Sequence, residues 1–170
     1  MRTGKSIKAM AAFLTAALLF TGCSGKTTSP DVPSEPSGSE QTAKSVQEIY
    51  QEIEQTVSLK SPQCMDEDFI LNYYDIDTAE LEEYVFSMSE DAAQAETIIL
   101  MKVKNPEDLE IFADCLQTIV DDKKSEMEDY IPEQFAIVEK SRVQTRDNYL
   151  WLVISDNADE ITDIIESGLF

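Results

Sequence analysis

The chain has 170 residues, of which 34 are Asp or Glu and 13 are Lys or Arg, so its formal net charge is −21 at pH 7. Because it contains no histidine, the common forms of Ser–His–acid and Cys–His nucleophilic sites, and of zinc sites, are excluded. The excess of acidic residues also excludes nucleic acid as a partner, since phosphates are bound by clustered Lys and Arg. It argues against a domain that lies flat on anionic lipid as well, because the like charges repel each other.

The first 22 residues have the pattern of a signal peptide. Arg2, Lys5 and Lys8 are followed by an uncharged apolar run at 9–20, which is shorter than the roughly 20 residues that span a bilayer. The sequence at 20–23 (FTGC) resembles the lipobox of bacterial lipoproteins, although Phe stands where those proteins usually carry Leu. The resemblance implies a lipid on the Cys23 thiol and cleavage between Gly22 and Cys23. The alternative is an ordinary signal peptide that ends near a cysteine.

Residues 23–44 are predicted to be the lipidated cysteine and a disordered tether rich in Ser, Pro and Gly, with Val32 as the only large aliphatic residue. A flexible chain of this length reaches roughly 25 Å. Removal of residues 1–22 leaves ten basic against 34 acidic residues. The predicted location is the outer face of the cell membrane, with the membrane as a partner through the lipid, because two acyl chains hold almost permanently.

Hydrophobic periodicity divides residues 45–170 into the elements of a single globular α+β domain. The clearest signals are Asn105-Pro106, which opens a helix, and the apolar, β-branched run at 149–154. The predicted elements are a helix at 45–58, a short helix around 69–73, strands at 83–88 and 98–103, a helix from 106 to about 127, helical turns at 132–138, strands at 142–146 and 149–154, and a helix after Asp156 or Asn157.

The order of these elements predicts an N-terminal helix followed by two strand–strand–helix units. Hairpins joined by helices indicate an antiparallel sheet with helices packed on one face. The inner strands at 98–103 and 149–154 are apolar on both faces. The second face of the sheet is therefore covered by the N-terminal helix or by a partner.

Four blocks of the domain resemble a known family. They are residues 71–77 (LNYYDID), 82–85 (EEYV), 130–135 (YIPEQF) and 149–156 (YLWLVISD). On these blocks, residues 66–169 resemble the small lipoproteins of clostridia and their relatives that contain domain of unknown function 4358. Asp147-Asn148 departs from that pattern, because family members often have a glycine turn there. The resemblance implies a Gram-positive type of cell surface, and it implies no activity and no catalytic residue.

Aromatic side chains give one candidate binding face. Tyr149 and Trp151 lie on the same side of the strand at 149–154, and aromatic residues on an open sheet face make good ligand platforms. The alternative is that they form ordinary core beneath the N-terminal helix. The loop at 89–94 is a second candidate contact.

The remaining candidates are cysteines and carboxylates. Cys64 and Cys115 form a possible disulfide, which an extracytoplasmic location permits; alternatively, Cys115 is a small hydrophobe beside the apolar stripe of its helix. Asp75 and Asp77 do not continue into a calcium loop, since Ala79 stands where a ligand belongs. We therefore predict no metal, no cofactor and no catalytic residue.

Three functions remain open. The favoured one is a non-catalytic binding or accessory module of the cell envelope, whose partner is an envelope protein, a second copy of the chain or a small ligand. The second is a small glycan hydrolase that acts with two carboxylates, and the third is a passive acidic protein that buffers cations. An uncovered apolar sheet face favours the first function, a cleft with two close carboxylates favours the second, and a featureless acidic surface favours the third.

Overall fold

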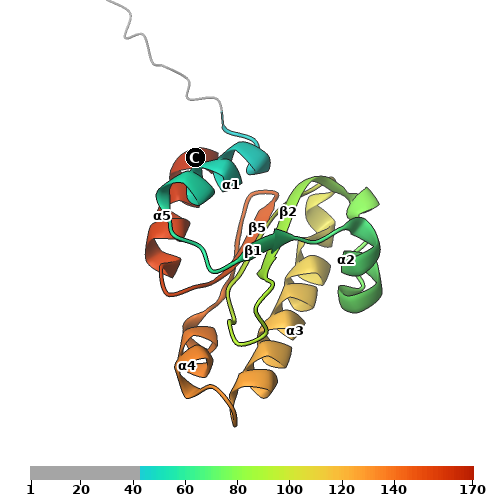
Figure 1. Cartoon of the computed structure of the whole chain (residues 1–170). Helices are drawn as coiled ribbons and strands as arrows, with labels where there is room; N and C mark the ends of the chain where they lie inside the picture. The colour runs from blue at the N-terminus through green and yellow to red at the C-terminus, as the bar shows by residue number, and fades with distance from the viewer. Residues whose placement is uncertain (1–42) are drawn as a thin grey trace, which may run out of the picture. The chain divides into compact units, whose positions relative to one another are not determined.

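The computed structural model describes residues 43–170 (Figure 1). The predicted signal peptide, the lipidation site at Cys23 and the tether up to residue 42 lie outside the described residues. Between residues 43 and 170, no helix combines the length and the apolar character that crossing a bilayer requires.

The described chain contains both helices and strands, mixed along its length. Ser45 begins the first helix with a capping box, in which its hydroxyl accepts from the Glu48 N–H and the Glu48 carboxylate accepts from the Ser45 N–H. The elements are α1 (Val46–Thr56), β1 (Pro62–Cys64), α2 (Glu67–Tyr74), η1 (Thr78–Glu80), β2 (Leu81–Ser89), β3 (Thr97–Val103), η2 (Pro106–Asp108), α3 (Leu109–Met127), α4 (Pro132–Lys140), β4 (Val143–Arg146), β5 (Tyr149–Ile154) and α5 (Ala158–Leu169).

The five strands form one antiparallel sheet in the order β1-β2-β3-β5-β4. The predicted strand at 149–154 coincides with β5, and the prediction of an α+β domain with an antiparallel sheet is confirmed. Asp147 adopts a left-handed conformation (φ 54°) in the two-residue turn between β4 and β5, where a short polar residue tolerates positive φ. The two strand–strand–helix units are β2-β3-α3 and β4-β5-α5.

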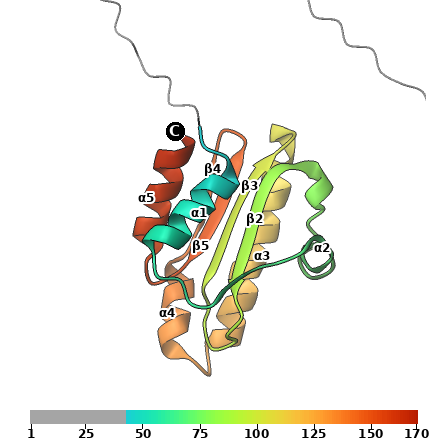
Figure 2. The same ribbon diagram turned by 45° about the horizontal axis from the view of Figure 1, so that its top comes forward.

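Helices cover both faces of the sheet, which corrects the prediction of helices on one face (Figures 1 and 2). On one face, α2, α3 and α4 pack against Phe86, Ile99 and Leu152. On the other, α1 and α5 pack against Leu100 and Trp151. Successive strand residues point to opposite faces, so strands that are apolar throughout need two helical layers. The N-terminal helix therefore covers the second face together with α5.

The domain has two distinct ends along its strands, which we call the near end and the far end. At the near end, the backbone N–H of Lys44 donates to the Gly168 carbonyl at 2.8 Å, and the Phe170 ring lies 6.2 Å from that of Tyr149. At the far end, Ile154 pairs with Thr97, beside the loop that joins β2 to β3. The described chain thus begins at the near end, while the turn from β5 into α5 lies at the far end (Figure 2).

Candidate functional site

The predicted binding face of Tyr149 and Trp151 is not open. Trp151 is only 2% exposed and lies in the apolar layer under α1 and α5, and Tyr149 is half-buried at its edge. Lys102 places its Nζ 5.6 Å from the centre of the Tyr149 ring. Trp151 belongs to the core and Tyr149 packs against it, so the platform that the sequence suggested is occupied by the protein's own helices.

The two cysteines lie on opposite faces of the sheet. Both thiols are free, so the disulfide that the sequence left open between Cys64 and Cys115 is not formed in the structure. Cys64 pairs with Ser87, whose Oγ accepts a hydrogen bond from Tyr50 of α1, so it lies on the α1 face. Cys115 belongs to α3 on the other face. Burial is the main cause that raises the pKa of each thiol, and neighbouring carboxylates raise it further. Neither cysteine is therefore an activated nucleophile.

Two acidic residues beside α2 and η1, one of them the calcium candidate Asp77, have structural partners. Asp66 accepts a hydrogen bond from the Phe69 N–H at 2.8 Å and so caps α2, and Asp77 accepts from the Ala79 N–H at 2.9 Å. Both carboxylates satisfy backbone donors at the starts of helices, where anions are favourable. In the part of the chain that the structure describes, no three His, Cys, Asp or Glu side chains are grouped to hold a metal ion.

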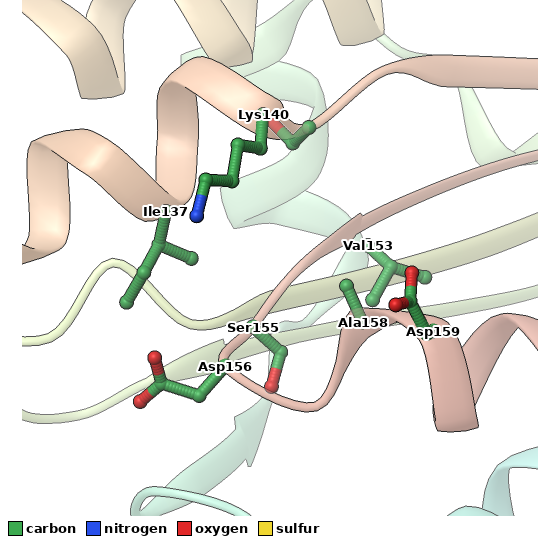
Figure 3. A pocket seen from close by; sticks show the side chains of 8 residues that line it. Ile137, Lys140, Val153, Ser155, Asp156, Ala158 and Asp159 are labelled. Carbon is green, nitrogen blue, oxygen red and sulfur yellow. The ribbon is translucent and has the colours of Figure 1, made fainter.

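A hollow of about 240 Å³ lies at the far end, where α4 ends and α5 begins. Figure 3 shows the side chain of Lys140 extending from the last turn of α4 across this hollow, with Asp156 and Asp159 on either side of Ser155. Its walls combine charged, hydroxyl and apolar side chains. They are Ile137, Lys140, Ser141, Val153, Ser155, Asp156, Ala158 and Asp159.

A buried carboxylate holds the floor of the hollow in place. Glu96 is 7% exposed, and its two carboxylate oxygens accept hydrogen bonds from the Lys60 N–H at 2.5 Å and from the Ser155 hydroxyl at 2.9 Å. Ser155 Oγ accepts in turn from the Asn157 N–H at 3.2 Å. Glu96 therefore joins the loop after α1, the start of β3 and the turn into α5.

The hollow is chemically suited to binding. Its two hydroxyl groups already donate to acceptors of the protein, Ser155 to Glu96 and Ser141 to the Val138 carbonyl at 2.6 Å. Lys140 has no carboxylate within 4.0 Å among residues 43–170, so its ammonium group is available to a ligand. Asp156 and Asp159 add acceptors, and Val153 and Ala158 add apolar surface. This combination matches a small site with a few converging polar groups.

The sequence did not point to this hollow. Glu96 precedes an apolar run, and its pattern resembles an ordinary exposed end of a strand. The only usable signal was Ser155-Asp156-Asn157 directly after a buried strand, because loops that follow buried strands often carry functional side chains. Asp156 and Asn157 entered the sequence analysis only as the point after which the last helix begins; Asn157 is the N-cap of α5 but makes no side-chain cap hydrogen bond.

The fold and the hollow together define a small two-sided α+β domain with a polar pocket at one end. Residues 55–155 match the model of the family described as domain of unknown function (DUF4358), and the chain belongs to that family. No curated protein matches the chain, and no solved structure matches it either.

Proposed function

We propose that this chain is a lipid-anchored protein of the outer cell-membrane face and that its domain is a non-catalytic binding module. The lipobox-like sequence that ends at Cys23 supports the anchor. The single observation that supports binding is the position of the hollow, which lies at the far end while the chain enters the domain at Lys44 of the near end. A tether that joins the domain at its near end leaves the hollow at the opposite end uncovered.

Several features of the hollow favour binding over catalysis. General acid–base chemistry needs a group with a pKa near the working pH, placed against the substrate. The Ser155 hydroxyl does not stand free against a substrate, because it already donates its proton to Glu96, whose other oxygen accepts from the Lys60 N–H. The volume of about 240 Å³ lies just below the usual range of small-molecule sites, about 300–1,000 Å³. A side chain or a terminal group of a larger partner fits this space better than a glycan chain.

The anchor is tested by replacing the lipidated cysteine. Cys23→Ala is expected to abolish lipidation, so that the protein leaves the membrane fraction or accumulates as precursor. Cys64→Ala is the matched control, since it removes a thiol without touching the lipobox. Equal retention of wild type and Cys23→Ala on salt-washed membranes would show that lipid on Cys23 is not the anchor.

Binding at the hollow is tested by placing a photo-crosslinking residue at Asp156 and, as a control, at the exposed Asp121 on α3. In intact cells we expect one discrete cross-linked product from position 156 and none from position 121. Identical product patterns from both positions would mean that the hollow is not the contact.

One observation favours a second function, a carboxylate-dependent glycan hydrolase, because Asp156 and Asp159 both line the hollow. Assays against envelope glycans with Asp156→Asn and Asp159→Asn separate the two functions. Turnover by the wild type that either substitution abolishes, with the fold retained by circular dichroism, would establish the enzyme and reject the binding module.

A further inference from the structure

The strand β4 is an open edge of the sheet. It pairs with β5 on one side, and no described strand pairs with its other side. Arg146 and Tyr149 flank the two-residue turn and face each other as a pair, and hydrogen-bonded and non-bonded pairs alternate along an antiparallel ladder. Thr145, opposite Leu150, therefore directs its backbone N–H and C=O outward, and so does Val143.

This edge is basic in a domain that is otherwise acidic. After residue 43 the chain has nine Lys and Arg residues, and three of them, Lys140, Arg142 and Arg146, fall within residues 140–146, which contain no acid. Arg142 and Arg146 lie on the same side of β4 as Gln144, because strand residues alternate. The flanking acids are Glu139 and Asp147.

The three cations have no carboxylate partner within 4.0 Å among the described residues. Arg142 donates to the carbonyls of Glu139 and Ser141 at 2.7 and 2.6 Å. Arg146 places its guanidinium carbon 3.6 Å from the centre of the Phe170 ring. These contacts hold the two arginine side chains without a carboxylate partner.

We propose that β4 binds an extended, acidic peptide segment of another envelope protein, which adds a strand to the sheet at Thr145 and pairs its carboxylates with Lys140, Arg142 and Arg146. Addition of a strand to a sheet edge derives affinity from main-chain hydrogen bonds and specificity from side chains. The inference rests on the proposed binding function and names the chemistry of the partner. The edge adjoins the hollow, because Lys140 belongs to both.

Charge selects this occupant over a second copy of the chain. Antiparallel pairing of β4 with the β4 of another molecule would bring the two arginine-bearing faces together, and like charges that face each other across strands are destabilising. Charged side chains on an edge strand oppose self-pairing for the same reason. An acidic strand meets no such repulsion.

The test uses the chain from Ser24 to Phe170 and a probe, an acetylated peptide in which Glu alternates with Thr. The control peptide carries Lys in place of Glu. Thr145→Pro removes one outward N–H without breaking the ladder with β5, since proline is tolerated on the open side of an edge strand. Thr145→Ala keeps that N–H and is its matched control.

By fluorescence anisotropy at low salt, we expect the acidic probe to bind and the Lys peptide not to bind. Thr145→Pro is expected to weaken binding at least about ten-fold through a lost hydrogen bond and the added ring. Lys140→Gln and Arg142→Gln should each weaken it about two- to five-fold, the range for exposed ion pairs. Thr145→Ala should leave binding unchanged.

Four outcomes would overturn the proposal. Absence of probe binding, or binding that resists Thr145→Pro but needs the cations, would exclude strand addition; the second result would favour an anionic polymer. Probe binding that appears only after residues 24–42 are removed would make the chain's own acidic segment the occupant. A cross-link from position 156 that survives in the Thr145→Pro variant would leave the binding function in place while the edge assignment fails.

Discussion

The hydroxyl of Tyr50 in α1 donates a hydrogen bond of 2.7 Å to Ser87 Oγ on β2, inside the apolar layer between the helix and the sheet. Both residues are buried. This contact fixes the rotation of α1 on the sheet, because a buried hydroxyl without a partner costs about 1–3 kcal/mol. It also ties the first element after the predicted tether to the middle of the fold.

Tyr50→Phe is expected to lower the free energy of unfolding by about 1–3 kcal/mol at neutral pH, since Ser87 Oγ loses its donor. Burial raises the pKa of Tyr50 to about 12 from the ordinary value of 10.0. A raised pKa means that the folded state holds the proton more tightly, so the wild type should lose stability as the pH rises from about 10 towards 12.

Urea unfolding at a series of pH values checks this prediction. The free-energy difference between wild type and Tyr50→Phe should shrink above pH 10, because only the wild type carries the group that is destabilised there. Tyr74 and Tyr84, whose pKa values are also raised by burial, titrate in both proteins and cancel. A difference that stays constant up to pH 12 would show that Tyr50 is not buried as described.

Glu96→Gln is predicted to loosen the far end of the domain. A carboxylate accepts at both oxygens, whereas an amide has only one oxygen that accepts. In the variant, either the Lys60 N–H or the Ser155 hydroxyl therefore loses its acceptor. The expected loss of stability is about 1–3 kcal/mol, with faster amide hydrogen exchange at Lys60 and Asn157. Glu90→Gln, at an exposed glutamate of the same loop, is the matched control and should change neither quantity.

How far the sequence predicted the fold depends on where the signals lay. The inner strands and α3 were predicted well, because β-branched runs and Asn105-Pro106 are local signals. β1 was missed, because its three residues are all exposed and its strand conformation depends on pairing with β2. Tertiary contacts of that kind leave no hydrophobic periodicity in the sequence.

The sequence did not predict the arrangement of the layers or the position of the site, for a related reason. A run that is apolar on both faces indicates that two layers cover a strand, but it does not say which helix takes which face. The distance between Cys64 and Cys115 depends on that choice: both thiols are free, and the sheet lies between them. Glu96 and Ser155 are 59 positions apart, so only the folded sheet brings them together.

Trp151 provides a spectroscopic check on the layer formed by α1 and α5. Because the side chain is 2% exposed, we expect a blue-shifted emission maximum that soluble quenchers do not reach. Trp151→Ala should cost about 3–5 kcal/mol, the range for large aromatic truncations. Trp151→Phe should cost less, since it keeps a ring and removes an indole N–H that has no acceptor among the described residues. Red-shifted, quenchable emission would place the indole on an open surface.

Gly168 of α5 lies against Ile49 of α1. It offers a test in which one substitution changes stability in opposite directions in two backgrounds. A Cβ atom at this position would lie 2.7 Å from Ile49 Cγ1 and 3.0 Å from Ile49 Cδ1. Alanine is favoured over glycine in a helix by about 1 kcal/mol, while overpacking of a core costs about 1–3 kcal/mol. At 2.7 Å the clash outweighs the propensity, so Gly168→Ala is expected to destabilise the wild type.

The same substitution should stabilise the protein when Ile49 is replaced by Ala. Ile49→Ala alone is expected to cost about 2–5 kcal/mol through the cavity that it leaves, and it removes both atoms that oppose a Cβ at position 168. In that background Gly168→Ala gains the helix propensity and fills part of the cavity. Urea unfolding of the wild type, the two single variants and the double variant gives the coupling energy, because residues in contact are not additive. Additive free energies in this cycle would mean that α1 and α5 do not meet at Ile49 and Gly168, and the helical layer over Trp151 would then need a different register.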